Sequence, residues 1–381
     1  MAANSTNNND ILEVKISEMV TTRFNVVTGM VEYTKGKNYQ PMTDYVERSM
    51  LRSLKNSGHN IGVAPLRNIL NSDFSPPYNP FLDYFESLPN WDGQTNYIEE
   101  FCNLVDVENN EHWIGWFTKW LVSLIAGAID KNVVNQQVLV LAGGQGIGKT
   151  TWLNHIVPKK LDKYSSTGYL NPDSKDALIQ ASECILVNID ELSSLNNKNL
   201  EAFKQLVTQI KIRVRKPYGF NPENLVKRAS FCGSTNEEQF LIDATGNRRF
   251  LCFKVGDIDL DRLANFNIDN VFSQAYAMYK NGFKYWFDKE ENKLIEINNS
   301  NYILRTLEEE AIMNEFCPCS KEEEGINIFK WTASEVMLFL SNSGLITNNA
   351  ASAQRVGKAL IKLGYIRFKS NGRMFYKIKK K

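Results

Sequence analysis

Residues 138–152 read VLVLAGGQGIGKTTW, and this stretch decides the fold that the sequence predicts. The all-apolar run at 138–141 is typical of a strand that is buried on both faces of a parallel sheet. The glycine-rich segment at 143–150 matches G-x-x-x-x-G-K-[ST], and a helical pattern begins directly after it. Strand, loop and helix therefore follow one another in the order that a phosphate-binding loop requires.

The loop has the chemistry to bind a nucleoside triphosphate. Glycines let successive backbone N–H groups point inward at phosphate oxygens, and the following helix start adds partial positive charge. We expect Lys149 to reach the β- and γ-phosphates and the Thr150 hydroxyl to hold Mg²⁺. The residues expected to bind ATP are Gly143, Gly144, Gln145, Gly146, Ile147, Gly148, Lys149, Thr150 and Thr151.

Two further apolar runs, at 184–189 and 229–232, alternate with helical patterns. This alternation indicates an α/β domain with a mainly parallel sheet. Asp190 and Glu191 follow the first of these runs, at the strand end where open α/β sheets bind ligands. We expect Asp190 to support Mg²⁺ and Glu191 to polarise the attacking water as a general base. A solvated turn is the alternative for such an acidic pair.

Polar residues after the third run add two more candidates. The Asn236 amide can hydrogen-bond a γ-phosphate or the attacking water, and a plain turn asparagine is the alternative. Arg248 and Arg249 follow a Gly-Asn turn and are candidates for an arginine finger. Such a residue stabilises the transition state of phosphoryl transfer and can come from a neighbouring subunit. A surface basic pair is the other interpretation, and the sequence does not decide which arginine would serve.

With these motifs assembled, residues 79–287 resemble the virulence-associated protein E family of phages and mobile elements, whose members are similar to superfamily 3 helicases of the AAA+ class. The resemblance rests on the segments at 143–150, 190–192, 216–219, 233–236 and 245–250, in that order. It implies an AAA+ P-loop core that hydrolyses ATP and moves along single-stranded DNA as a ring, usually a hexamer. It also implies that Asn236 is the sensor residue and that Arg248 or Arg249 is the finger.

A basic hairpin is predicted between the acidic pair and the third strand. Residues 212–216 alternate apolar and basic side chains, a Pro/Gly/Asn turn follows, and residues 225–228 return. In the similar helicases a hairpin here points into the pore of the ring. The expected contacts to single-stranded DNA are Arg213, Arg215, Lys216, Tyr218, Lys227 and Arg228, because cations suit phosphates and rings suit bases. A solvated hairpin, or basic residues that bridge subunits, is the alternative.

Residues 325–381 carry eleven Lys or Arg and one acid, a net charge of +10, whereas the whole chain of 381 residues is at +1. TASE at 332–335 predicts a capping box and SNG at 370–372 predicts a hairpin. Helix, basic helix and hairpin together are typical of a winged helix on duplex origin DNA. The expected DNA contacts are Arg355, Lys358, Lys362, Arg367 and Arg373. Winged helices also bind proteins, but the charge favours DNA.

Composition sets the remaining expectations. Hydrophobic residues make up 43% and charged residues 23%, the balance of a folded protein rather than of a disordered or multi-span membrane protein. The apolar stretch at 113–129 contains Lys119 and is short for a membrane span, so it predicts a buried helix. The six cysteines and three histidines show no zinc-binding spacing.

The expected domains are an N-terminal region with a disordered start (1–75), a helical bundle (76–130), the ATPase domain (131–290), a linker (291–324) and the winged helix (325–381). The sequence thus predicts a cytoplasmic, ATP-dependent DNA helicase for replication of a phage or mobile element. A separate primase or polymerase is a further expected partner, because the first 75 residues are too few for a priming domain. One alternative is an ATPase that loads or remodels proteins on DNA without unwinding. The other is an origin-binding initiator that uses ATP only as an assembly switch, which has little use for a lytic base such as Glu191.

Overall fold

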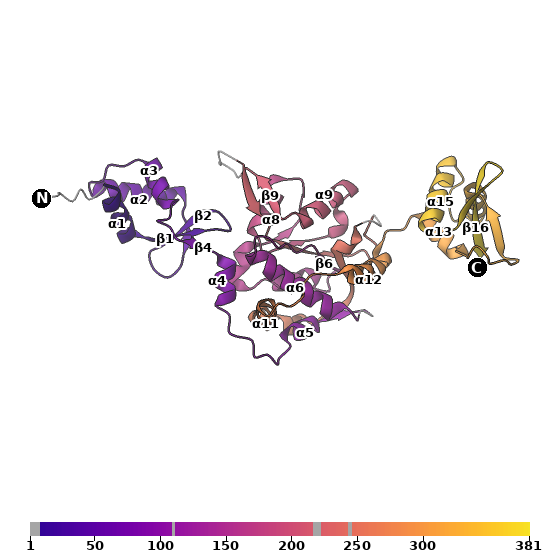
Figure 1. The fold of residues 1–381 in the computed structure, drawn as a ribbon, viewed down its shortest axis with the longest axis horizontal. Helices are drawn as coiled ribbons and strands as arrows, with labels where there is room; N and C mark the ends of the chain where they lie inside the picture. The colour runs from indigo at the N-terminus through magenta and orange to yellow at the C-terminus, as the bar shows by residue number, and fades with distance from the viewer. Residues whose placement is uncertain (1–7, 109–110, 216–221, 243–245) are drawn as a thin grey trace. The chain divides into compact units, whose positions relative to one another are not determined.

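The computed structural model describes residues 8–108, 111–215, 222–242 and 246–381 and divides the chain into two compact units (Figure 1). The larger unit comprises residues 1–238 and 245–301, and the smaller unit comprises residues 239–244 and 302–381. As predicted, the chain is a mixed α/β protein with a central sheet and helices around it. Within the described ranges no helix is long and apolar enough to cross a membrane.

A six-stranded sheet with the order β5-β12-β6-β11-β8-β7 forms the centre of the larger unit. From β12 to β7 each strand pairs in parallel with the next, whereas β5 pairs with β12 antiparallel. The three apolar runs expected as strands form β6, β8 and β11. The strands are Val105–Val107 (β5), Val138–Gly143 (β6), Ser165–Gly168 (β7), Leu186–Ile189 (β8), Ser230–Thr235 (β11) and Phe250–Ile258 (β12).

Helices pack on both faces of this sheet. On one face, Leu139 and Leu141 join a core that includes residues of α6 (Trp113–Ile129) and α7 (Lys149–His155). On the other face, Phe203 of α9 (Asn197–Thr208) packs edge-on against Phe231, with ring centroids 5.2 Å apart. Alternate residues of each strand therefore serve opposite cores, which explains why the strands read as continuous apolar runs. The other helices of this part are α4 (Pro80–Glu86), α5 (Tyr97–Cys102), α8 (Lys175–Glu183), α10 (Leu260–Ala264), α11 (Ile268–Lys280) and α12 (Lys289–Asn299).

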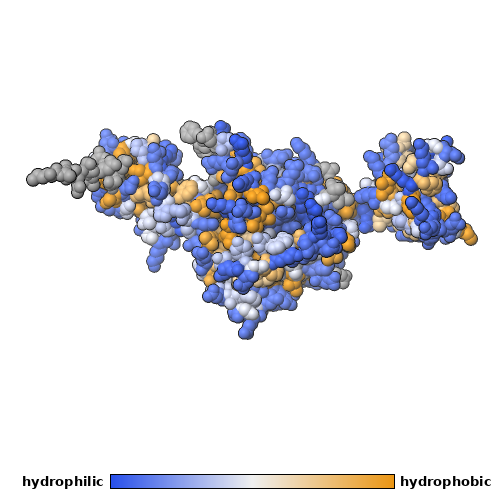
Figure 2. All heavy atoms as spheres, viewed as in Figure 1, coloured by the Kyte–Doolittle hydropathy of each residue, from blue (hydrophilic) through white to orange (hydrophobic). Residues whose placement is uncertain are grey.

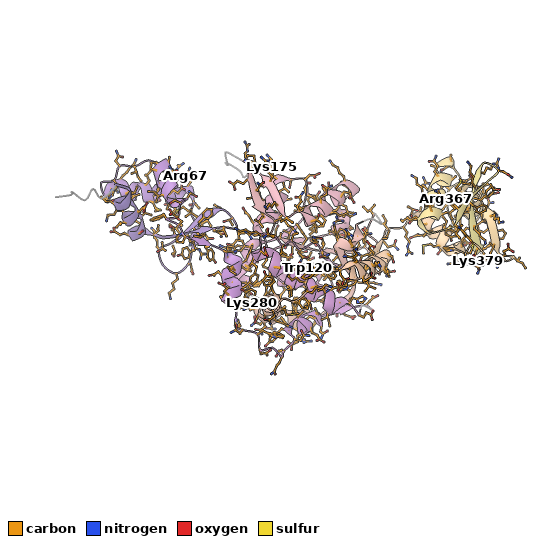
Figure 3. The ribbon with its side chains drawn as sticks, in the orientation of Figure 1. Arg67, Trp120, Lys175, Lys280, Arg367 and Lys379 are labelled. Atoms are coloured by element: carbon orange, nitrogen blue, oxygen red, sulfur yellow. The ribbon has the colours of Figure 1, made fainter. Side chains whose placement is uncertain are left out.

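The helix expected over residues 113–129 is confirmed as α6. Trp120, labelled in Figure 3, is completely buried in its middle. Lys119, the charged residue that the apolar stretch contains, forms an ion pair with Glu291 at the edge of the core. The stretch is therefore apolar because the protein core surrounds it on most sides.

Residues 8–78 form a small sheet with three helices in the larger unit, with strand order β3-β2-β1-β4. The Arg23 guanidinium lies 3.4 Å from the centroid of the Tyr78 ring and also pairs with Glu32. The elements are α1 (Asn8–Met19), β1 (Thr21–Asn25), β2 (Met30–Thr34), β3 (Gln40–Pro41), α2 (Asp44–Asn56), α3 (Val63–Leu70) and β4 (Pro77–Tyr78). Residues 1–10 were expected to be disordered. Residues 1–7 lie outside the described residues, whereas residues 8–10 form the start of α1.

The smaller unit has its own core, in which Val336, Val356, Leu360 and Ile378 are fully buried. The predicted capping box at Thr332 and the predicted hairpin are both present, the latter with Asn371 and Gly372 at positive φ as a type I′ turn requires. The elements are α13 (Leu307–Glu315), β13 (Phe316–Cys317), β14 (Ile328–Trp331), α14 (Ala333–Asn342), α15 (Ala350–Lys362), β15 (Arg367–Ser370) and β16 (Arg373–Lys380).

The segment expected as a linker, residues 291–324, contains α13, β13 and most of α12. A second capping box, formed by Thr306 and Glu309, begins α13. Ile312 of this helix is fully buried in the core of the smaller unit. The part of this segment from residue 302 onward therefore belongs to the folded smaller unit, where Glu308 and Glu309 pair with basic residues.

Candidate nucleotide-binding site

Glycines shape the loop between β6 and α7. Gly146 and Gly148 have φ angles of 83° and 93°, in the left-handed region that favours glycine. A Cβ on Gly143 would lie 2.5 Å from the backbone oxygen of Val255, which is closer than atoms can pack. The loop thus needs glycine both for its turns and for its close approach to β12.

Lys149 is buried and bonded to the loop that precedes it. Its Nζ donates hydrogen bonds to the backbone oxygens of Gly143 (2.9 Å) and Gly144 (2.6 Å) and to Oδ1 of Asn236 (3.0 Å). Burial lowers the pKa of Lys149, and the nearby carboxylates of Glu191 and Asp190 oppose that shift. These carboxylates favour the charged ammonium that an anionic ligand requires.

Thr150 and Asp190 meet beside the lysine. The Thr150 hydroxyl donates to Oδ1 of Asp190 at 3.0 Å, and the Ser234 hydroxyl donates to the same oxygen at 3.1 Å. The two hydroxyls are 3.3 Å apart. Three oxygen ligands of the kind that Mg²⁺ prefers therefore lie within one small cluster.

Glu191 is held by three neighbours in an uncommon backbone conformation. Its carboxylate accepts hydrogen bonds from Nδ2 of Asn236 (2.9 Å), from the Thr235 hydroxyl (3.3 Å) and from the Ser193 hydroxyl. Its φ of 58° places it in the left-handed region, which costs a residue with a side chain about 1–3 kcal/mol. Strain of this kind persists where the surroundings over-determine it, and it concentrates at functional sites.

The strand order explains why these residues meet. β11 lies between β6 and β8, and all three run parallel, so their carboxyl ends share one edge of the sheet. The loop follows β6, Asp190 and Glu191 follow β8, and Asn236 follows β11. Sequence reasoning missed Ser193, Ser234 and Thr235, although the position of the last two at the end of the third apolar run was a usable signal.

This cluster fits ATP with Mg²⁺ in its chemistry. No heavy atom lies within 4 Å of the place that a Cβ on Gly146 would take, and the buried Lys149 ammonium contacts the same loop. Mg²⁺ is usually bound through one or two protein oxygens together with phosphate oxygens and water, which Thr150 and Asp190 could provide. Thr151, also predicted to bind ATP, is exposed in the first turn of α7.

The two candidate arginines lie at the opposite edge of the sheet. They form a short 3₁₀ turn directly before β12, whose first residue pairs with Val138 at the start of β6, whereas its Val255 pairs with Gly143. Five residues of strand, about 17 Å, separate these two edges. Arg248 and Arg249 therefore do not contact the cluster around Lys149 of their own chain.

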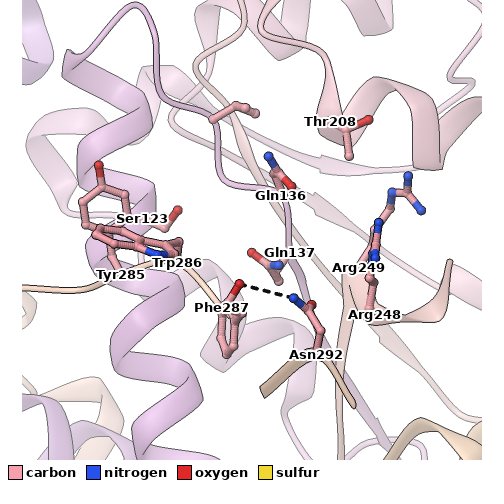
Figure 4. A pocket seen from close by; sticks show the side chains of 11 residues that line it. Ser123, Gln136, Gln137, Thr208, Arg248, Arg249, Tyr285, Trp286, Phe287 and Asn292 are labelled. Carbon is pink, nitrogen blue, oxygen red and sulfur yellow. Dashed lines mark hydrogen bonds between the residues drawn. The ribbon is translucent and has the colours of Figure 1, made fainter. Parts of the chain in front are cut away.

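Both arginines line a cavity of about 380 Å³ (Figure 4). Arg248 is exposed, whereas Arg249 is half-buried and donates from Nη1 to the backbone oxygen of Gly246 at 3.4 Å. Burial and the neighbouring Arg248 charge lower the pKa of Arg249. The cavity is otherwise lined by Ser123, Val134, Gln136, Gln137, Thr208, Tyr285, Trp286, Phe287 and Asn292.

The predicted basic hairpin is present as β9 (Lys211–Val214) and β10 (Glu223–Val226), paired antiparallel. Ile212 and Val214 are buried, and Arg213 and Arg215 are exposed, as the alternation predicts. Lys216 and Tyr218 lie outside the described residues, so their predicted roles stay predictions.

The prediction that Lys227 and Arg228 contact DNA is wrong, because both residues are buried. Nζ of Lys227 donates to the backbone oxygens of Val207 (2.9 Å) and Asn135 (3.1 Å), and it lies 5.2 Å from the centroid of the Phe231 ring. Nη1 of Arg228 donates to the backbone oxygen of Ala128 at 3.1 Å. These cations bind carbonyl oxygens inside the fold, which removes them from the predicted DNA-binding set.

Substituting Lys227 by methionine is expected to flatten the pH dependence of stability. Burial lowers the pKa of Lys227 to about 7, against about 10.4 in an unfolded chain. Between these values the unfolded chain binds a proton that the folded chain lacks, so the free energy of unfolding rises with pH, by at most about 1.4 kcal/mol per pH unit. The check is denaturant unfolding of wild type and Lys227→Met from neutral to alkaline pH. Exposed Lys211→Met is the control, and equal slopes for wild type and Lys227→Met would contradict the expectation.

In the smaller unit, two cations expected to read DNA are engaged by glutamates of α13. Nε of Arg355 pairs with Glu308 at 2.5 Å, and Nζ of Lys362 pairs with Glu309 at 2.8 Å. Both glutamate side chains are only 7% exposed. Lys358, Arg367 and Arg373 are exposed. Two of the three cations predicted on α15 are therefore paired within their own unit, although the side chains of Arg355 and Lys362 stay 48% and 38% exposed.

Comparison with known proteins identifies the family. Residues 85–303 match the virulence-associated protein E-like domain, and because this is more than half of the chain, the chain belongs to that family. The family suggested by the motifs is thereby confirmed. No curated protein sequence matches the chain.

Among the solved structures that match, two examples are similar to almost the whole chain. One is the apo structure of the NrS-1 C-terminal region, with a TM-score of 0.55 and 12% identity. The other is the A form apo structure of the same region, with a TM-score of 0.52 and 11% identity. Each alignment covers 97% of this chain and 98% of the other chain. At such identities the similarity shows a shared fold.

Proposed function

We propose that this chain is an ATP-dependent DNA helicase, ring-forming and superfamily 3-like, that acts in the replication of a phage or mobile genetic element. One observation carries the proposal: Lys149, Thr150, Asp190, Glu191 and Asn236 converge at one edge of a parallel sheet. Membership of the virulence-associated protein E-like family supports it. A cytoplasmic location and a separate primase or polymerase partner belong to the same proposal.

The residues at the cluster have distinct proposed roles. ATP bound with Mg²⁺ would supply a phosphoanhydride bond whose hydrolysis drives movement. Lys149 would exchange its bonds to the loop oxygens for phosphate oxygens, and Thr150 and Asp190 would hold the metal. Glu191 would accept the proton of the attacking water. Asn236, bonded to both Lys149 and Glu191, would couple the state of the phosphate to that base.

An assembly of several chains would complete each site. Since the arginines of one chain lie at the far edge of its sheet, only another copy could bring them to the bound nucleotide. We assign the finger role to Arg248, which is exposed, and a positioning role to Arg249, which holds the turn through the Gly246 oxygen. An AAA+ core in a ring, with six copies as the expected number, would place one edge against the other.

The DNA contacts would come from both units. Arg213 on the exposed side of β9 and Arg215 directly after the strand are suited to the backbone of a single strand. The helix, helix and hairpin order of α14, α15 and β15–β16 fits a winged helix, which we propose for duplex origin DNA. Lys358, Arg367 and Arg373 are its exposed candidates.

ATP turnover and strand release, measured with and without single-stranded DNA, test the proposal. We expect stimulation by DNA and release of an annealed strand from a forked substrate. The double variant Arg213→Ala/Arg215→Ala should lose the stimulation, and its slope of log affinity against log salt should fall by about 0.7 for each lost phosphate contact. Lys175→Ala, an exposed cation on α8, is the matched control.

Turnover without strand release would overturn the helicase proposal and favour the loading or remodelling ATPase. Nucleotide binding without turnover would favour the assembly switch. A mass measurement with nucleotide bound, run beside these assays, reports the number of chains in the assembly.

A further inference from the structure

The outer face of the sheet in the smaller unit alternates cations and aromatic rings. Tyr376 and Ile378 of β16 point into the core, so that Arg373, Phe375 and Lys377 stand on the opposite face. Successive residues on one face of a strand are about 6.8 Å apart. The order along β16 is therefore cation, ring, cation at regular steps.

Neighbouring strands widen this arrangement. Phe368 of β15 lies opposite Phe375, and the two half-buried rings stack with centroids 5.9 Å apart and planes 20° apart. Lys330 of β14 lies opposite Lys377 and is exposed. We call Arg373, Phe375, Phe368 and Lys330 the hairpin face. Figure 2 shows hydrophilic and hydrophobic residues side by side on the visible side of the smaller unit.

An acidic loop limits the hairpin face on one side. Nζ of Lys377 donates to the backbone oxygen of Lys321 at 2.7 Å, and Lys379 pairs with Glu323 at 2.5 Å. Figure 3 labels Lys379 in this unit. The loop thus engages the cations at the C-terminal end of β16. The stacked rings, Lys330 and Arg373 lie beyond these contacts. Hydrogen bonds from Thr332 and the charge of Arg373 lower the pKa of Glu335.

Going beyond the proposed function, we propose that the hairpin face binds single-stranded nucleic acid. Unpaired bases expose the flat surfaces that stacked phenylalanines can bind, and cations beside the rings suit the phosphates between those bases. Duplex DNA hides these surfaces, and α15, which would read its major groove, has Arg355 and Lys362 paired with α13. The chemistry of the hairpin face therefore suits a single strand bound on the sheet, at a place separate from α15.

Fluorescence anisotropy of the full-length protein with a labelled oligothymidine of about 20 nucleotides tests this site. The chain carrying Arg213→Ala/Arg215→Ala is the background, so that the hairpin of the larger unit contributes little. Adding Phe368→Leu/Phe375→Leu should weaken binding by about 5- to 150-fold. Affinity for a duplex of the same length should fall less. Met374→Leu, on the other face of β16, is the control.

Two measurements separate this site from a folding defect and from the proposed function. The variant Phe368→Trp should bind the oligothymidine and show quenching of its tryptophan fluorescence. Unchanged oligothymidine binding by the double leucine variant would overturn the site, and this is the result expected if a protein occupies the face. An equal loss of affinity for single strand and duplex would also overturn it. If the wild-type protein shows no ATP turnover, the proposed function is overturned. If the double leucine variant still loses single-strand binding in that case, this site stands.

Discussion

Replacing Glu191 with glutamine is expected to lower ATP turnover by about 10²–10⁴-fold while ATP still binds. The amide keeps the size of the side chain and an oxygen for the Asn236 amide, which now donates to the carboxylate at 2.9 Å. It cannot accept a proton from water at neutral pH. Binding and turnover should therefore separate, with nucleotide affinity close to wild type and single-turnover hydrolysis strongly slowed.

Glu237→Gln provides the control for this result, since Glu237 is an exposed carboxylate two residues beyond Thr235. Its substitution removes one negative charge near the site without touching the proposed base. Full turnover in Glu191→Gln would remove Glu191 from the mechanism. An equal loss in both variants would assign the effect to charge near the loop rather than to proton transfer.

Arg248→Ala is expected to reduce turnover by about 10³-fold or more, the effect typical of a finger supplied by a neighbour. The residue lies about 17 Å of strand away from the loop of its own chain, so the loss would come from an adjacent copy. Mixing Arg248→Ala with Lys149→Ala protein should restore part of the activity, because some interfaces then combine an intact loop with an intact arginine.

Arg249→Ala is tested in the same way, alone and mixed with Lys149→Ala protein. If Arg249 acts only by positioning the turn at Gly246, it should lower turnover less and should also lower thermal stability. Rescue with Arg249→Ala in place of Arg248→Ala would reverse the assignment of the two arginines. Absence of rescue with either arginine variant would contradict a shared site.

The sequence indicated that the glycine-rich loop, the acidic pair and Asn236 would meet at one edge of the sheet, because that arrangement depends on local patterns. An apolar run followed by glycines, or by an acidic pair, marks where a strand ends, and parallel strands bring such ends together. β12 was not predicted as a strand. Its apolar start is followed by Lys254, Gly256 and Asp257, which interrupt the run although pairing with β6 continues through Val255.

The predictions for basic residues were less successful, because the sequence does not show which group each basic side chain contacts in the folded protein. Lys227 continues an alternating basic pattern, yet it lies in the core with two carbonyl oxygens as acceptors. Arg355 and Lys362 lie on the expected face of α15, yet Glu308 and Glu309, about 50 positions earlier, neutralise them. Only the tertiary fold brings these partners together.

The bonds from Lys149 to Asn236 and from Asn236 to Glu191 have a kinetic consequence. The Asn236 amide accepts a hydrogen bond from the Lys149 ammonium through its oxygen and donates one to the Glu191 carboxylate through its nitrogen. In the proposed mechanism, rotation of this single side chain would carry a displacement of Lys149 to Glu191. Rotamer changes take picoseconds to nanoseconds, far less than domain motions. In the proposed ATPase, the passage of a change between Lys149 and Glu191 should therefore not limit turnover, and slower rearrangements of the chain would.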